Sequence, residues 1–105
     1  YIFSKDLNFE NQSDQLTICD IDPEIIKDLK ETSESDIYLC GGGQFAGWLL
    51  ESEMIDILKI KLNPLILGHG IALFGKSKKT HQLKLSQNEV YADGLAILTY
   101  LINYP

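Results

Sequence analysis

Three consecutive glycines, residues 41–43, constrain this chain more than any other feature. Before them stands a short, mostly apolar run, DIYLC (36–40), and after them comes QFAGWLLESEM, whose apolar residues recur at helical spacing. The run predicts a central strand buried on both faces, and the spacing predicts a helix directly after Gly43. The backbone must therefore pass from strand to helix through a turn that carries no side chains.

Glycines at a strand end let the backbone adopt positive φ and come close to a ligand. The first N–H groups of the following helix then point beyond the strand, where an anion such as a diphosphate is their natural guest. The pattern is neither a G-x-G-x-x-G fingerprint nor a Walker loop. From spacing alone, a tight strand-to-helix turn that binds nothing is an equal alternative.

The charge balance excludes several kinds of partner. The net charge is −6, and all nine basic residues are lysines. Nucleic-acid surfaces need clustered cations, and the one local cluster, at 76–79, predicts only a solvated loop. No apolar run approaches the roughly 20 residues of a membrane span, and no signal-peptide pattern opens the chain. We expect neither a nucleic-acid partner nor a membrane partner.

The two cysteines, Cys19 and Cys40, have no metal-site spacing and form no disulfide framework. Each ends a predicted strand, where a free cysteine serves as a small buried hydrophobe. A reduced, cytoplasmic protein is therefore expected, with no metal site.

The remaining elements follow from periodicity and turn chemistry. Asp22-Pro23-Glu24 predicts a helix start, because Asp22 can cap and Pro23 fits the first helical position; the helix should end near Thr32. Residues 6–14 and 63–75 predict irregular segments, the second anchored by Phe74. Strands are expected at 1–3, 15–19, 55–62, 83–91 and 95–102, and Asp93-Gly94 predicts the turn between the last two.

Strands that alternate with helices predict the α/β class with right-handed crossovers. We expect one domain over residues 1–105, with a mixed, mostly parallel sheet and flanking helices. A C-terminal antiparallel hairpin should form the edge of that sheet. The last strand is apolar on both faces, which is more than an edge strand carries in water. Either a missing N-terminal portion or a second subunit is expected to cover it.

Two motifs together resemble the dihydrofolate reductase superfamily, and more closely its riboflavin-biosynthesis reductase branch. The first is DIYLCGGGQFAGWLLESEMID, and the second is LKIKLNPLILGHGIALF. The resemblance covers essentially the whole chain, more loosely before Asp36. It implies a dihydrofolate-reductase-like fold and an NADPH-dependent reductase that transfers hydride to a pteridine- or pyrimidine-like substrate. Dihydrofolate and 5-amino-6-(5-phosphoribosylamino)uracil are both compatible, and the second motif favours the riboflavin-type branch.

The resemblance also implies roles for particular residues. The glycine turn would cradle the cofactor diphosphate, with the aromatic ring beside it, through Gly41, Gly42, Gly43, Gln44 and Phe45. Ser4 and Lys5 would lie near the 2′-phosphate of the adenosine, and Cys40 would end its strand beneath the nicotinamide. Cys19 would end a strand next to the adenine pocket.

Members of this family carry an N-terminal portion that has no counterpart here, and it holds most substrate contacts. Because the chain starts at Tyr1 rather than Met, we expect it to start inside a longer gene product or after processing. We expect residues 1–105 alone to turn over no substrate, and no catalytic residue is assigned. The family resemblance also implies a homodimer.

Other candidate residues have plain structural interpretations. His69, between two glycines, could act as an acid or base, but a polar residue at a loop tip is the preferred interpretation. His81 begins a polar strand and is expected to be solvated. Trp48 and Leu49 lie at helical spacing and predict core positions.

Three functions therefore compete. The first is the NADPH-dependent reductase. The second is a nucleotide-binding module that has lost reduction, and the third is a structural or interaction fragment whose glycines only make a turn. Binding and consumption of NADPH separate them.

Overall fold

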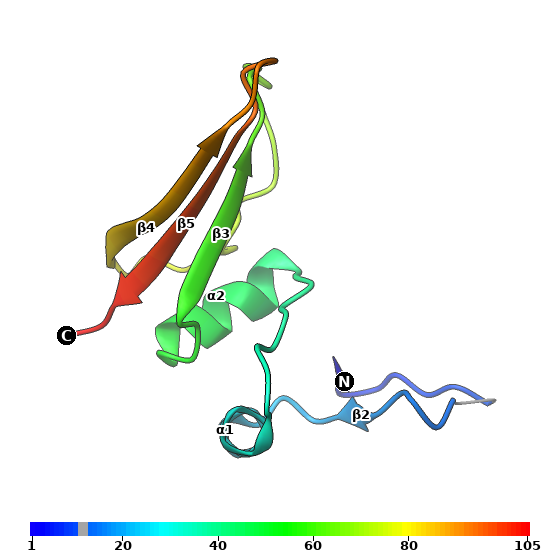
Figure 1. Ribbon diagram of the computed structural model, residues 1–105. Helices are drawn as coiled ribbons and strands as arrows, with labels where there is room; N and C mark the ends of the chain where they lie inside the picture. Colours follow the sequence, from blue (N-terminus) through cyan, green and yellow to red (C-terminus); the bar gives the residue numbers. More distant parts are fainter. Residues whose placement is uncertain (11–12) are drawn as a thin grey trace. The chain divides into compact units, whose positions relative to one another are not determined.

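The computed structural model describes residues 1–10 and 13–105, so that residues 11 and 12 of the predicted loop 6–14 lie outside it. The chain forms two compact units, Tyr1–Tyr38 and Leu39–Pro105. Both contain strands and a helix, in the order β1, β2, α1, α2, β3, β4, β5 (Figure 1). The predicted α/β class is confirmed, and a single domain over the whole chain stays a prediction.

The first unit contains a short parallel pair of strands. β1 (Ile2–Phe3) pairs with β2 (Ile18–Cys19) in the register Ile2 to Ile18. The N–H of Ser4 extends this pairing by donating to the carbonyl of Cys19 at 2.9 Å. Strands were predicted at both places, and the observed ladders are shorter.

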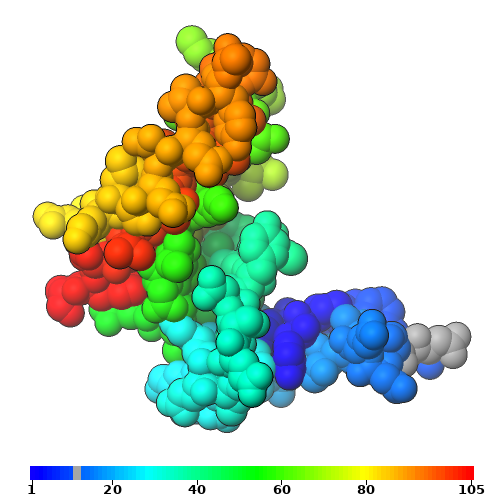
Figure 2. Space-filling model, viewed as in Figure 1, coloured from blue at the N-terminus to red at the C-terminus, as the bar shows by residue number. Residues whose placement is uncertain are grey.

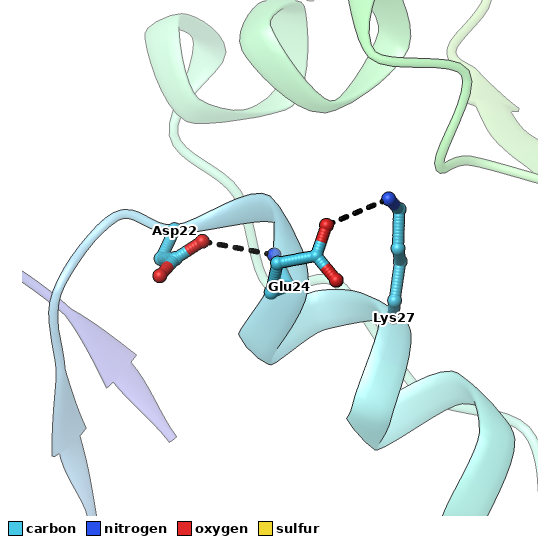
Figure 3. Close-up of polar contacts among 3 residues, drawn as sticks. All are labelled: Asp22, Glu24 and Lys27. Carbon is cyan, nitrogen blue, oxygen red and sulfur yellow. Dashed lines mark hydrogen bonds and ion pairs between the residues drawn. The ribbon is translucent and has the colours of Figure 1, made fainter.

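Helix α1 (Pro23–Thr32) begins as its sequence predicts. The Asp22 carboxylate accepts from the N–H of Glu24 at 2.9 Å, and Pro23 occupies the first turn (Figure 3). Glu24 also pairs with Lys27 at 2.8 Å, an exposed contact that adds little stability. The buried residue of the helix is Ile26.

The second unit is a helix and an antiparallel sheet of three strands. α2 (Gly43–Glu51) is followed by β3 (Ile57–Leu62), β4 (Gln82–Val90) and β5 (Ala96–Asn103). The strand order is β3-β5-β4. A turn closes the β4–β5 hairpin, where Gly94 has φ +91° and the Asp93 carboxylate accepts from the N–H of Leu95 at 3.1 Å. The predicted hairpin and its turn are confirmed.

A β-bulge interrupts the β4–β5 ladder. Leu85 pairs with Tyr100 and Gln87 pairs with Thr99, so Ser86 has no counterpart on β5. The bulge and the pairing register decide which residues share a face. One face carries apolar residues from all three strands: Leu58, Ile60, Leu62, Leu83, Leu85, Val90, Ala96, Leu98, Tyr100 and Ile102.

Helix α2 packs at one end of that apolar face. Its buried residues are Ala46, Gly47, Leu49 and Leu50, and Ile102 of β5 is buried as well. Leu50 and Ile102 line one cavity, so the helix and the sheet meet there. The hairpin end of the sheet extends away from α2, in orange in Figures 1 and 2, and there Leu62 is 56% and Val90 74% exposed.

The loop between β3 and β4 is irregular over residues 63–75, as predicted, and Phe74 anchors it. Phe74 is half-buried, whereas Ile66 is 99% exposed. The loop therefore packs at its Phe74 end and is open to solvent in its middle.

The strand predicted at residues 36–40 is absent, and that prediction is wrong. Ile37 is 55% and Tyr38 85% exposed, and no strand among the described residues pairs with this segment. A short apolar run becomes a central strand only where neighbours stand on both sides to accept its backbone groups. Within residues 1–10 and 13–105, parallel pairing is limited to β1 and β2, less than the mostly parallel sheet that we expected.

The last strand does not lie at an edge, contrary to expectation. β5 lies between β3 and β4, and both edges of this sheet belong to other strands. Because β5 is hydrogen-bonded on both sides, its backbone exposes no unpaired edge to which another chain could add a strand. What covers the second face of β5 stays a prediction.

Candidate functional site

The candidate site is the glycine turn at the start of α2. Gly42 is the N-cap residue, with φ −57° and ψ 168°, and no side chain caps the helix. Gly41 has φ +111°, a conformation that favours glycine, and the peptide bond between these two glycines is cis. The helix ladder starts with the N–H of Ala46, which donates to the carbonyl of Gly42 at 2.9 Å.

The turn is open. A Cβ placed on Gly41 or on Gly42 would meet no atom within 4 Å, and both residues are exposed. Within residues 1–10 and 13–105, no protein acceptor meets the N–H groups of Gly43 and Gln44. Two donors and the positive end of the helix dipole are thus available to an anion.

Gly43 has a packing role that the sequence did not reveal. A Cβ there would lie 2.7 Å from the carbonyl oxygen of Ala72 and 3.3 Å from the nitrogen of Gly75. A Cβ on Gly47, one helical turn further along, would approach the carbonyl oxygen of Phe74 even more closely. Helix α2 therefore lies directly against the backbone of residues 72–75. Of the three consecutive glycines, only the first two border open space.

An aromatic pair follows the turn. The rings of Phe45 and Trp48 stack with centroids 5.7 Å apart and planes 18° apart. Trp48 is half-buried and Leu49 is buried, so the predicted core position is confirmed for Leu49 and partly met by Trp48. Gln44 is exposed. Phe45, the first member of the stack, lies two residues after the start of α2. We therefore expect a ligand bound at the glycine turn to change the fluorescence of Trp48.

Ser4 and Lys5 lie in the first unit, whereas the glycine turn lies in the second. The Ser4 hydroxyl accepts from the N–H of Leu7 at 3.1 Å and donates to the Asp6 carboxylate at 3.3 Å, so it organises a local turn. Lys5 is exposed. The structure describes each unit by itself, and the joint site of these residues with the glycines stays a prediction.

Cys40 is exposed and outside any strand, so its predicted burial at a strand end is wrong. The reason is the missing strand at 36–40, which leaves no ladder to bury it. Cys19 ends β2 as predicted and is half-buried. Both cysteines are free.

The expected exposure is confirmed for one of the two histidines and is wrong for the other. His69 is exposed in the loop, as expected. His81, expected to be solvated, is half-buried with both ring nitrogens shielded from solvent. Its polar sequence neighbours suggested exposure, but the ring packs edge-on against Tyr104, with centroids 5.4 Å apart. Sequence periodicity carried no signal for this contact, because the two residues lie on different segments.

The described ranges contain neither a metal-ligand cluster nor a membrane-spanning helix. No group of three or more His, Cys, Asp or Glu side chains there is placed to hold a metal ion. No helix in the described part of the chain has both the length and the apolar composition needed to cross a membrane.

Comparison with solved structures defines the class. A pyrimidine reductase-like protein from Corynebacterium diphtheriae shares the fold with a TM-score of 0.68 and 22% identity, over 85% of this chain and 39% of its own. A candidate riboflavin biosynthesis protein from Shewanella sp. PV-4 matches with a TM-score of 0.75 and 25% identity, over 97% of this chain and 59% of its own. The fold is that of the reductase-like α/β proteins. Within that class, residues 2–98 match the RibD C-terminal domain, and the chain belongs to this family.

A curated relative is similar over nearly the whole chain. The uncharacterized protein YyaP of Bacillus subtilis is 28% identical over 101 residues, which are 95% of this chain and 53% of YyaP. This chain thus spans between about two fifths and three fifths of the length of these relatives. The expected resemblance to the riboflavin-biosynthesis branch is confirmed.

Proposed function

We propose that this chain is the cofactor-binding part of an NADPH-dependent reductase. The observation that carries the proposal is the open turn at Gly41 and Gly42, above which two N–H groups of α2 lack a protein acceptor. Membership of the RibD C-terminal domain family supports a reductase.

The residues present fit a diphosphate. Gly41 and Gly42 leave room for its oxygens, and the N–H groups of Gly43 and Gln44 can donate to them. The helix dipole adds about 0.3–1 kcal/mol per favourable charge at such an exposed terminus. NADPH, when bound, supplies the hydride, and the chain's own task is to hold and orient it.

The other cofactor contacts belong to the same proposal. Lys5 carries a cation suited to the 2′-phosphate, and Ser4 supplies a hydroxyl beside it. Cys40, exposed directly before the glycines, would lie near the nicotinamide. Phe45 would border the diphosphate through the stack that it shares with Trp48.

For the substrate we propose a pyrimidine of the 5-amino-6-(5-phosphoribosylamino)uracil type. The similar Corynebacterium protein is pyrimidine reductase-like, and the similar Shewanella protein is a candidate riboflavin biosynthesis protein. Dihydrofolate is the alternative that the fold also admits. We assign no substrate contact or proton donor to residues 1–105, and propose that this segment needs additional residues for turnover. A cytoplasmic homodimer completes the proposal.

The test is a titration of NADPH followed by the fluorescence of Trp48, the only tryptophan of the chain. The key variant is Gly42→Ala, because a Cβ at Gly42 enters open space and φ −57° suits alanine. Its fold should survive while NADPH binding weakens by about tenfold or more, as one phosphate contact of about 1.5 kcal/mol is obstructed. Gly70→Ala is the matched control, since Gly70 lies in the loop and its Cβ would make only an ordinary contact at 3.5 Å.

The outcomes separate the three candidate functions. Binding together with oxidation of NADPH, by the chain within a polypeptide of its relatives' length and with the pyrimidine present, supports the reductase. Binding without oxidation indicates a nucleotide-binding module. No fluorescence response, or equal affinity in Gly42→Ala and the parent chain, contradicts the role of the turn.

A further inference from the structure

A second turn supports the start of α2. Residues 72–75 form this 72–75 turn, in which the N–H of Gly75 donates to the carbonyl of Ala72 at 3.2 Å. Phe74 is half-buried and anchors the turn, whereas Ile66, earlier in the same loop, is 99% exposed. The end of the loop that meets α2 is therefore its fixed end.

Gly75 lies against one particular peptide unit of α2. A Cβ on Gly75 would lie 3.0 Å from the carbonyl oxygen of Gly43, and 3.1 Å from both the carbonyl carbon of Gly43 and the Cα of Gln44. These three atoms belong to the peptide unit that joins Gly43 to Gln44, and the same unit carries the N–H of Gln44. That N–H is one of the two donors without a protein acceptor within residues 1–10 and 13–105.

The planarity of this peptide unit couples its two sides. The carbonyl and the N–H point in opposite directions, and the unit moves as one rigid plane. A push on the carbonyl oxygen of Gly43 therefore tilts the N–H of Gln44. Gly75 has φ +55°, and only glycine at this position combines that conformation with a contact that leaves the peptide unit in place.

We propose that Gly75 is a positioning residue for the cofactor. It touches no ligand itself. By supporting the peptide unit between Gly43 and Gln44 from its carbonyl side, it fixes the direction in which the N–H of Gln44 donates to the diphosphate. Hydrogen bonds weaken steeply as the donor angle closes, so a small tilt of this unit lowers affinity. The inference rests on the proposed function, because it requires an anion at the glycine turn.

Gly75→Ala tests the proposal, and Gly68→Ala is its matched control. Both glycines lie in the loop between β3 and β4 at positive φ, +55° and +80°, so alanine is strained at each. Only at Gly75 does the added Cβ reach α2, since at Gly68 it would meet nothing within 4 Å. We expect the affinity for NADPH, followed by the fluorescence of Trp48, to fall about tenfold in Gly75→Ala, as one charge-assisted hydrogen bond is weakened, and less than about twofold in Gly68→Ala.

Two further readouts separate positioning from a loss of stability. In the ¹⁵N-labelled chain saturated with NADPH, the amide proton of Gln44 should move downfield in the parent and in Gly68→Ala, and less in Gly75→Ala, where the bond to phosphate is misaligned. The second readout uses the parent chain alone. Because coupling between two sites is reciprocal, NADPH should slow the hydrogen exchange of the Gly75 N–H. The N–H of Gly94, bonded to the carbonyl of Tyr91 at 2.9 Å in the hairpin turn, should exchange as before.

Gly42→Ala separates this proposal from the proposed function. If the parent chain binds no NADPH, or if Gly42→Ala binds it equally well, the proposed function fails and the positioning role fails with it. If Gly42→Ala weakens binding but Gly75→Ala matches Gly68→Ala in affinity and in the Gln44 signal, only the positioning role is overturned. Unchanged exchange of the Gly75 N–H in the presence of NADPH also overturns it, even where Gly75→Ala does not fold.

Discussion

The contact between α2 and the loop at residues 72–77 predicts that Gly47→Ala destabilises the chain, although alanine is the better helix former. The new Cβ would overlap the carbonyl oxygen of Phe74 and lie 3.1 Å from its carbon. Both partners are backbone, so no side chain can turn away. That carbonyl also accepts from the N–H of Ser77 at 3.1 Å, and moving it strains this hydrogen bond.

The magnitude follows from three effects. Overpacking of this kind costs about 1–3 kcal/mol, and the weakened hydrogen bond costs about 1 kcal/mol. Alanine in place of glycine returns about 1 kcal/mol through helix propensity. The expected net loss in the free energy of unfolding is therefore about 2 kcal/mol.

Urea unfolding followed by far-ultraviolet circular dichroism measures this loss. A decrease of about 2 kcal/mol moves the midpoint down by about 1 M or more, at the slope expected for a chain of this size. Gly70→Ala should change stability by no more than about 0.5 kcal/mol, as an exposed loop substitution does. If Gly47→Ala proves as stable as the parent chain, or more stable, helix propensity dominates and the close approach of helix and loop is refuted.

Two further predictions concern the helix cap and the C-terminal tyrosine. Asp22→Ala removes the acceptor of the 2.9 Å cap bond, so thermal or urea unfolding should show a loss of about 1 kcal/mol; an unchanged midpoint would argue against the cap. Burial raises the pKa of the Tyr104 phenol, so the unfolded chain loses this proton first as the pH rises, and the stability contribution that is present below about pH 10 declines above it. Tyr104→Phe should show a shallower fall in stability than the parent chain between about pH 9 and pH 11, and parallel curves would contradict the assignment.

Local signals predicted the parts of the fold that depend on local chemistry. Asp22-Pro23-Glu24 placed the start of α1, and Asp93-Gly94 placed the hairpin turn, because caps and turns are decided by residues within one turn of each other. The periodicity after Gly43 likewise located α2. These features need no knowledge of the rest of the chain.

Features that depend on distant partners could not be predicted in this way. The segment 36–40 has the composition of a central strand, but burial requires neighbouring strands that its own residues cannot specify. His81 follows polar residues, yet it packs on Tyr104 from the far end of the sequence. For the candidate site, the sequence located the glycine turn, whereas the packing role of Gly43 appeared only once Ala72 was placed beside it.

The bulge at Ser86 shifts the alternation of side chains between the two faces of β4 by one residue. This shift keeps the apolar residues on both sides of the bulge on one face of the sheet. Before it, Leu83 and Leu85 face the same side as Ile102 and Tyr100; after it, the shifted pairing turns Gln87 and Glu89 to the opposite face and returns Val90 to the apolar one. If Ser86 were instead paired regularly in the ladder, the earlier alternation would continue, and Gln87 and Glu89 would then face the hydrophobic side. One unpaired residue thus decides whether the far half of β4 presents a carboxylate or a valine on the apolar face of the sheet.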